Sequence, residues 1–436
     1  MNREILHIAL PAIIANVTIP LLGLLDTAIA GHLGSAAFIG AIAVGSMIFN
    51  LVYWNFGFLR MSTSGLTAQT FGKGETAASR RVLKQACLVA LAVSLAIIVL
   101  QVPLLSLTMW IIDPSAEVRE LAVNYYYIVV WGAPPVLVMM AIKGWLLGMQ
   151  DSKGAMMVSI VVNVLNIIAS LIAVYALHMG FTGIAVGTLI AEWLGLAYAG
   201  LLVARHLNAM PQGEVVQSSS TQFGAMRFFK VSGDIFIRSF LLMLVNLAVV
   251  AIGARSGDLI LAANALIQQL NTLFAYFLDG IAFAGEALVG KYYGEANGSR
   301  LQLCVRRLFV WAMALTVVFT ILYSFPQLIF IILTDERTVI DTAMDYRWWC
   351  ALLPIAGMAA FVWDGVFIGL TRSRGMLLAV AVASAAFALI YWALPVTMGN
   401  HRLWLAFVIY LVLRGIVQTI IWLKLRSNLI IQTRFT

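Results

Sequence analysis

Ionisable side chains inside long apolar stretches are the residues of this sequence best placed to do chemistry. Asp26 lies in Gly23-Leu-Leu-Asp-Thr27, well inside the first apolar stretch, which also contains Pro11 and Pro20. Each proline removes a helical hydrogen bond and favours a bend. A buried carboxyl group beside a bendable segment can convert protonation into a change of shape, so we expect Asp26 to titrate. The alternative is that neighbouring hydroxyls or amides satisfy Asp26 and it has a structural role only.

The fifth and sixth apolar stretches carry polar side chains at helical spacing, so that each set lies on one helical face. These residues are Ser159, Asn163, Asn166 and Ser170 in the fifth stretch and Thr188 and Glu192 in the sixth. Such faces can line a hydrophilic pocket, or they can hold membrane helices together. The residues alone leave both readings open.

Further polar and ionisable side chains lie at membrane depth elsewhere, and we treat them as secondary candidates for a cleft. They are Lys143, Arg238, Asn264, Asp279 and Asp364. Lys143 and Asp364 occupy equivalent positions of an internal repeat, and they either face one another across the cleft or pair locally, which we favour. Because both signs of charge are present, charge alone does not choose between cationic and anionic cargo.

The repeat defines the elements that must position these residues. The segment Gly65 to Glu75 returns as Gly285 to Glu295, and Gly148-Met-Gln-Asp-Ser-Lys-Gly154 returns as Gly369-Leu-Thr-Arg-Ser-Arg-Gly375. The chain is 62% hydrophobic and only 11% charged, against about 25% charged in soluble proteins. Apolar runs long enough to cross a bilayer recur along its whole length.

We therefore predict an all-α integral membrane protein with twelve transmembrane helices, in two pseudo-twofold-related six-helix lobes around a central cleft. The lobes are expected at 1–206 and 225–436, joined by a linker at 207–224. The third and ninth spans are expected over 82–111 and 302–333. Most of the 27 Lys and Arg residues flank one set of span ends, which predicts that both termini lie in the cytoplasm.

The sequence lacks the signature motifs of several classes of protein. The three cysteines, Cys87, Cys304 and Cys350, have neither metal-site spacing nor an even number. We find no Walker A loop, no His-Glu-x-x-His motif and no nucleophile elbow. We therefore expect no cofactor, no metal site and no enzyme activity. The net charge of +8 comes from basic residues at span ends, which orient a protein in the membrane. We therefore expect no nucleic-acid partner.

The motifs together resemble the multidrug and toxic compound extrusion (MATE) family, in its DinF-like branch, over essentially the whole chain. They are Leu10-Pro11, Gly23-Leu-Leu-Asp-Thr27, Thr67-Ala-Gln-Thr-Phe-Gly-Lys-Gly74, Asn163-Val-Leu-Asn166, Gly183-Ile-Ala-Val-Gly-Thr188 and Asp279-Gly-Ile-Ala-Phe-Ala-Gly-Glu-Ala-Leu-Val-Gly290. The resemblance implies an antiporter in the bacterial inner membrane. It would export amphipathic, often cationic or aromatic, small molecules in exchange for protons or sodium.

The resemblance also assigns roles within the first lobe. Asp26 would bind the coupling ion, and Asn166 and Thr188 would belong to its network. Many relatives carry an acidic residue where this chain has Ser170, which removes a charged ligand for sodium and favours protons. Glu192 is a possible substitute for that acid.

Other readings remain open at this stage. One is a flippase for a lipid-linked sugar, which would require Arg60, Lys143 and Arg238 to converge, and another is sodium-coupled export. An enzyme acting on membrane lipids would lack an evident nucleophile or metal group. We expect a monomer whose other contacts are membrane lipids.

Overall fold

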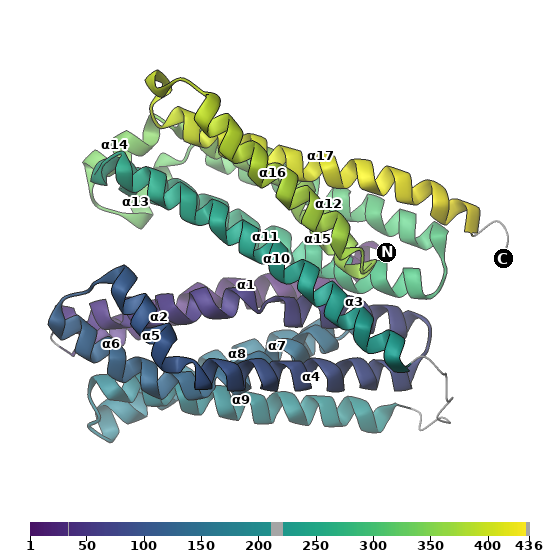
Figure 1. Ribbon diagram of the computed structural model, residues 1–436, viewed down its shortest axis with the longest axis horizontal. Helices are drawn as coiled ribbons and strands as arrows, with labels where there is room; N and C mark the ends of the chain where they lie inside the picture. Colours follow the sequence, from purple (N-terminus) through teal and green to yellow (C-terminus); the bar gives the residue numbers. More distant parts are fainter. Residues whose placement is uncertain (34, 211–220, 433–436) are drawn as a thin grey trace. The chain divides into compact units, whose positions relative to one another are not determined.

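The structure is a computed structural model that describes residues 1–33, 35–210 and 221–432, and the described chain is helical throughout (Figure 1). Twelve helical segments are long and apolar enough to cross a membrane, which confirms the predicted number. The helices are α1 (Asn2–Gly31), α2 (Ala36–Asn55), α3 (Phe58–Gly72), α4 (Thr76–Val99), α5 (Gln101–Ile112), α6 (Ala116–Val129), α7 (Ala133–Gly148), α8 (Ser152–Leu171), α9 (Phe181–Ala209), α10 (Thr221–Arg255), α11 (Asp258–Gly294), α12 (Gly298–Tyr323), α13 (Gln327–Leu333), α14 (Arg337–Met344), α15 (Arg347–Gly369), α16 (Ser373–Ala393) and α17 (His401–Gln432). Short helical turns η1 (Val130–Gly132), η2 (Ile172–Ala176) and η3 (Val396–Met398) complete the set.

The predicted third and ninth spans are each divided in the structure into a long and a short helix. The span expected over 82–111 consists of α4 and the separate α5, and the span expected over 302–333 consists of α12 and α13. Pro103 and Pro326 stand close to these breaks, and neither can donate a backbone hydrogen bond to the preceding turn. A single apolar run in the sequence therefore folds into a long helix followed by a short one at corresponding places in both halves.

The two copies of the internal repeat each place a glycine at a close contact between two helices. A Cβ added at Gly148 of α7 would lie 2.6 Å from Thr67 Cβ and 2.7 Å from the Ser64 carbonyl oxygen of α3. At the equivalent Gly369 of α15, a Cβ would lie 2.9 Å from the Glu286 carbonyl oxygen of α11. Each glycine thus allows two backbones to touch, which explains why the repeated motif begins with glycine.

The chain forms two compact units, of which unit 1 is assembled from two parts of the sequence and unit 2 from one. Unit 1 comprises Met1–Ile13 and Lys230–Thr436, and unit 2 comprises Ile14–Phe229. Helices α1 and α10 each contribute to both units, so the units differ from the lobes expected at 1–206 and 225–436. Of the expected linker 207–224, residues 211–220 lie outside the described residues.

Side-chain contacts fix the first residues of α1 in unit 1 and the first residues of α10 in unit 2. In unit 1 the Tyr292 hydroxyl donates a hydrogen bond to Glu4 Oε1 of α1 at 3.0 Å. In unit 2 Phe228 of α10, which is 1% exposed, packs with buried Leu66, Ala86 and Ala141.

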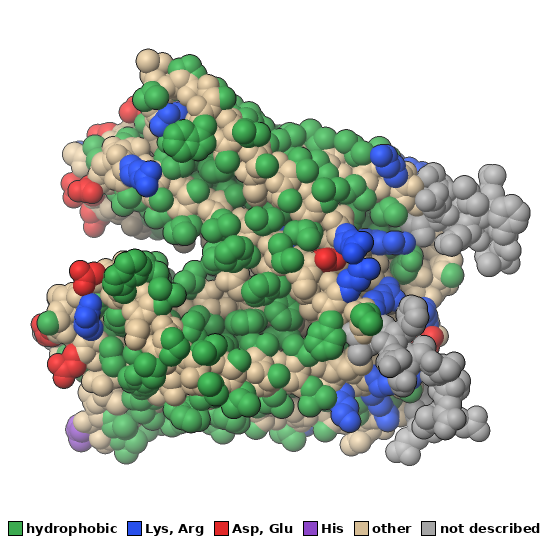
Figure 2. All heavy atoms as spheres, viewed as in Figure 1, with side chains coloured by type: hydrophobic (Ala, Val, Ile, Leu, Met, Phe, Trp, Pro, Cys, Tyr) green, Lys and Arg blue, Asp and Glu red, His purple; other side chains and the backbone are tan. Residues whose placement is uncertain are grey.

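The surface agrees with a membrane environment. Large apolar side chains on the helices are exposed; Leu95 of α4 is 62% exposed and Val310 of α12 is 51% exposed. In Figure 2 hydrophobic side chains cover the flanks of both units, while Lys and Arg side chains gather mainly near one end of each unit. The chain is therefore a multi-pass membrane protein.

Candidate functional site

Close packing of α8 against α9 brings the first group of predicted residues together in unit 2. A Cβ at Gly187 of α9 would lie 2.5 Å from both the Cα and the backbone nitrogen of Ser170. At this short separation Asn166 Nδ2 donates to Thr188 Oγ1 at 3.0 Å, and Ser170 Oγ donates to Asn166 Oδ1 at 3.4 Å. Thr188 Oγ1 in turn donates to the Ile184 carbonyl oxygen at 3.0 Å.

Asp26 lies near this network and forms no ion pair with any described residue. It belongs to α1 and is 9% exposed, and its Oδ1 atom is buried without a hydrogen-bond partner. Tyr125 of α6 lies within electrostatic range of Asp26, and its hydroxyl lies beside the Thr188 and Ser46 side chains. Tyr125 therefore connects the Asp26 carboxyl group to the hydrogen-bonded pair on α8 and α9.

Glu192 joins the same group from the next turn of α9. Its carboxylate lies directly against the backbone of Gly132, where a Cβ would meet the Glu192 Cδ at 2.8 Å. The Glu192 carboxylate lies within electrostatic range of both Tyr125 and Tyr53. The Glu192 Oε2 atom is buried without a hydrogen-bond partner among the described residues. Two carboxyl groups, Asp26 and Glu192, thus share one tyrosine-lined region of unit 2.

The remaining predicted residues of this half occupy supporting positions. Asn163 Nδ2 donates to the Thr18 carbonyl oxygen at 3.4 Å and so connects α8 to α1. Pro11 is buried and Pro20 is exposed, and α1 runs through both as one helix. A change of bend at these prolines remains a prediction.

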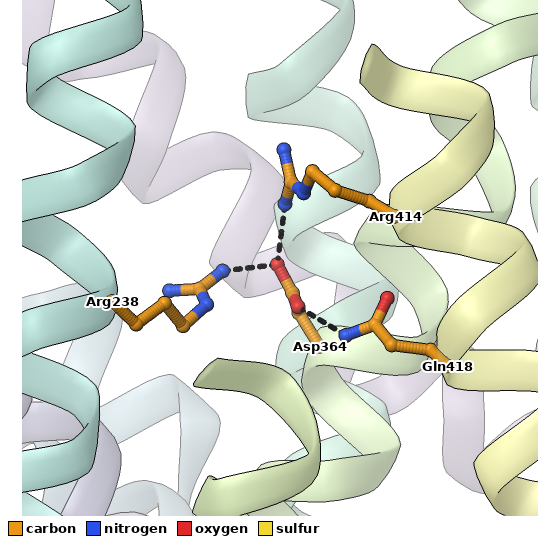
Figure 3. A network of polar contacts seen from close by, with 4 residues as sticks. All are labelled: Arg238, Asp364, Arg414 and Gln418. Atoms are coloured by element: carbon orange, nitrogen blue, oxygen red, sulfur yellow. Dashed lines mark hydrogen bonds and ion pairs between the residues drawn. The ribbon is translucent and has the colours of Figure 1, made fainter. Parts of the chain in front are cut away.

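Unit 1 contains a buried ionic cluster centred on Asp364 of α15 (Figure 3). Asp364 Oδ2 accepts hydrogen bonds from Arg238 of α10 and from Arg414 Nη2 of α17, the latter at 2.9 Å. Asp364 Oδ1 accepts from Gln418 Nε2 at 2.8 Å. Asp364 thus pairs within unit 1, and the pairing side chains come from two other helices, α10 and α17.

The other secondary candidates have different surroundings. Lys143 is half-buried and lies within electrostatic range of a second cation, Arg60, in unit 2. Asn264 exchanges amide hydrogen bonds with Asn400 at 2.7 and 3.1 Å and accepts one from Trp404 Nε1, so its side chain holds α11 to α17 and the loop before it. Asp279 is half-buried and lies within electrostatic range of the Tyr276 hydroxyl.

No group of three or more His, Cys, Asp or Glu side chains that could hold a metal ion occurs among the described residues. The donor atoms near Asp26 are instead one amide and several hydroxyl groups, of Thr188, Ser46 and Tyr125. This set suits the transfer of a proton or the binding of a small polar group.

Comparison with known proteins identifies the family to which this arrangement belongs. The MatE family matches residues 11–172 and 235–394, which are the two repeated halves. The chain belongs to the MatE family. DNA damage-inducible protein F of Escherichia coli K12 is 37% identical to this MatE chain over 428 residues, covering 97% of this chain and 92% of that protein.

More distant relatives and solved structures agree with this assignment. A probable multidrug resistance protein NorM of Acinetobacter baylyi is 23% identical over 423 residues, covering 92% of this chain and 88% of that protein. An outward-facing structure of a multidrug resistance MATE family transporter of the MOP superfamily superposes with a TM-score of 0.85. Its sequence identity is 17%, and the match covers 98% of this chain and 96% of that one. The fold is therefore that of MATE transporters.

Sequence reasoning did not identify all the residues of these sites. Tyr125 was missed, although the run Tyr125-Tyr126-Tyr127 in an apolar span is an unusual concentration of hydroxyl groups. Gln418 was also missed; it stands one helical turn after the intramembrane Arg414, a spacing that could have indicated a shared polar face.

Proposed function

We propose that this MatE protein is a secondary active antiporter that exports amphipathic, often cationic or aromatic, compounds in exchange for protons. It would work by alternating access in the bacterial inner membrane, with both termini in the cytoplasm. The family membership and the multidrug resistance relatives support the transport class. The environment of Asp26 supports the coupling by protons.

The contrast between two buried carboxyl groups carries this proposal. Asp364 is neutralised by Arg238 and Arg414, so a proton arriving there would have to displace an ion pair. Asp26 is in no ion pair within the described part of the chain, and its Oδ1 atom is unpartnered. An uncompensated buried charge is costly, so gain of a proton by Asp26 removes a cost that nothing else offsets.

The hydrogen bonds around Asp26 support protons over sodium. A hard cation requires several oxygen ligands. Asn166 Oδ1 already accepts from Ser170, and Thr188 Oγ1 already accepts from Asn166. These bonds occupy one of the two lone pairs on each oxygen, so a sodium ion would have fewer free ligand positions here, whereas a proton needs only one carboxylate oxygen.

The energy available from one proton is sufficient for useful export. A charge moving across the membrane yields about 2.3 kcal/mol per 100 mV. Since about 1.4 kcal/mol corresponds to a factor of ten, one proton supports roughly a 50-fold gradient of a neutral compound. Protonation of Asp26 from outside would let α1 bend at its prolines and expel cargo, and proton release to the cytoplasm would reset the site.

The test is efflux of a cationic dye from proteoliposomes driven by an imposed pH gradient. The Asp26→Asn variant should fold as the wild type does and lose proton-driven efflux. Asp341→Asn, on an exposed position of α14, is the matched control and should keep it. Normal efflux by Asp26→Asn would remove Asp26 from the coupling role.

The same vesicles separate the alternatives. Efflux that follows a sodium gradient and survives a protonophore would overturn proton coupling. A lipid-linked sugar flippase is the second candidate. Arg60 lies within electrostatic range of Lys143 in unit 2, whereas Arg238, the third cation that a flippase would require, pairs with Asp364 in unit 1. Wild-type protein that moves a fluorescent pyrophosphate-linked lipid between leaflets, and exports no dye, would favour that flippase.

A further inference from the structure

The ionic cluster of unit 1 contains more positive than negative charge. Arg238 and Arg414 contribute two cations, and Asp364 contributes the single anion that both contact. All are buried: Arg238 is 4% exposed, Arg414 5% and Asp364 7%. An ionisable group at membrane depth ordinarily has a partner or a function, and here one cation exceeds what Asp364 can neutralise.

The cluster also has hydrogen-bond donors without acceptors. Both oxygens of Asp364 are already used, Oδ2 by the two arginines and Oδ1 by Gln418. The Nε atoms of Arg238 and Arg414 are buried without a hydrogen-bond partner. A guanidinium group has donors only, and the cluster itself holds one unpartnered acceptor, Gln418 Oε1, for these two N–H groups. An acceptor from outside the cluster would therefore satisfy the remaining donor.

Apolar rings stand beside the excess charge. The Arg414 guanidinium lies 5.5 Å from the centre of the Tyr410 ring and 5.8 Å from that of Phe361. The side chain of Asp364 keeps 10% of its surface exposed, so the cluster is not completely enclosed. A ligand with an aromatic body and one anionic group would match both features.

We propose that the cluster Arg238–Asp364–Arg414–Gln418 binds the anionic group, a carboxylate or phosphate, of an amphipathic compound that this protein exports. Arginine suits this role because its planar N–H groups match the oxygens of both anions. The inference rests on the proposed export function, since it adds a class of cargo to it. It predicts that the export range includes amphipathic anions as well as cations.

The experiment is equilibrium dialysis of the protein in nanodiscs against 2-naphthoate and its uncharged amide, which share the same rings. The wild type should retain the carboxylate and bind the amide at least about tenfold more weakly, the size expected for a charge-assisted contact. Arg238→Gln and Arg414→Gln should each lower naphthoate affinity by about tenfold or more. Asp364→Asn, which removes the competing negative charge, should raise that affinity.

Two further variants identify the place of binding. Arg307→Gln, on an exposed position of α12, should leave naphthoate affinity unchanged. Arg306 lines a separate cavity of about 840 Å³ between α12, α15 and α17, with Trp363, Trp422 and Arg426. Loss of binding in Arg306→Gln, with full binding in Arg238→Gln, would place the anion in that cavity and overturn the proposal.

The amide comparison needs no substitution, so it stays decisive even if an arginine variant fails to fold. Equal affinity of the wild type for naphthoate and its amide would overturn the proposal. Dye efflux by the same wild-type preparation reports on the export function separately. Efflux without charge-selective naphthoate binding would refute the anion site alone, whereas selective binding without efflux would refute the export function alone.

Discussion

Substitution of Gly187 by alanine should disrupt the network around Asp26 through the backbone of α8. The new Cβ would lie 2.5 Å from the Cα and backbone nitrogen of Ser170, whereas ordinary contacts span 3.4–4 Å. Because backbone atoms of a helix cannot rotate aside, α8 and α9 must separate locally by about 1 Å. The hydrogen bond from Asn166 to Thr188, now 3.0 Å, would lengthen or break.

The expected loss of stability follows from three contributions. Overpacking of a tight contact costs about 1–3 kcal/mol, and the lost hydrogen bond costs about 1 kcal/mol. The higher helix propensity of alanine returns about 1 kcal/mol. The net loss is roughly 1–3 kcal/mol, which corresponds to a melting temperature lower by roughly 2–12 °C for a unit of this size.

Thermal unfolding followed by tryptophan fluorescence in detergent measures this effect. Gly200→Ala is the matched control, because it lies on the same helix α9 and its Cβ would meet no heavy atom within 4 Å. That variant should melt at or slightly above the wild-type temperature. If Gly187→Ala melted as high as Gly200→Ala, the packing argument for the α8–α9 network would be refuted.

Two further substitutions address the tyrosine-lined region of unit 2. Gly132→Ala would place a Cβ 2.8 Å from the Glu192 Cδ. Because the flexible Glu192 side chain can change rotamer at a cost of about 1 kcal/mol, we expect near-normal melting and slower dye efflux. Unchanged efflux would argue against a role for Glu192. Tyr125→Phe removes the hydroxyl in contact with Thr188 and Ser46, and it should cost about 1 kcal/mol and slow proton-driven efflux. A Tyr125→Phe variant with wild-type efflux kinetics would show that the hydroxyl does not connect Asp26 to α8 and α9.

The elements that follow from local sequence patterns could be predicted. Twelve apolar runs gave the spans, and the helical spacing of Asn166 and Ser170 gave their common face. The resemblance to a known family added Asp26 to the same group. The two divided spans were missed because a hydropathy pattern does not register the single hydrogen bond that Pro103 or Pro326 cannot make.

The contacts that depend on distant segments could not be predicted in the same way. Asp364 was recognised as a membrane carboxyl group, but its partner Arg238 precedes it by 126 residues. Asn264 was a secondary candidate for a cleft, yet its side chain bonds that of Asn400, 136 residues away. A sequence shows that a polar residue needs a partner, whereas the tertiary fold decides which one it receives.

The division of α1 between the two units has a consequence for biosynthesis. Met1–Ile13 are synthesised before all of unit 2, but they pack in unit 1 with the segment that starts at Lys230. Domains generally fold as they are synthesised, starting from the N-terminus. Here the first turns of α1 can pack with the rest of unit 1 only after the whole of unit 2 has been synthesised.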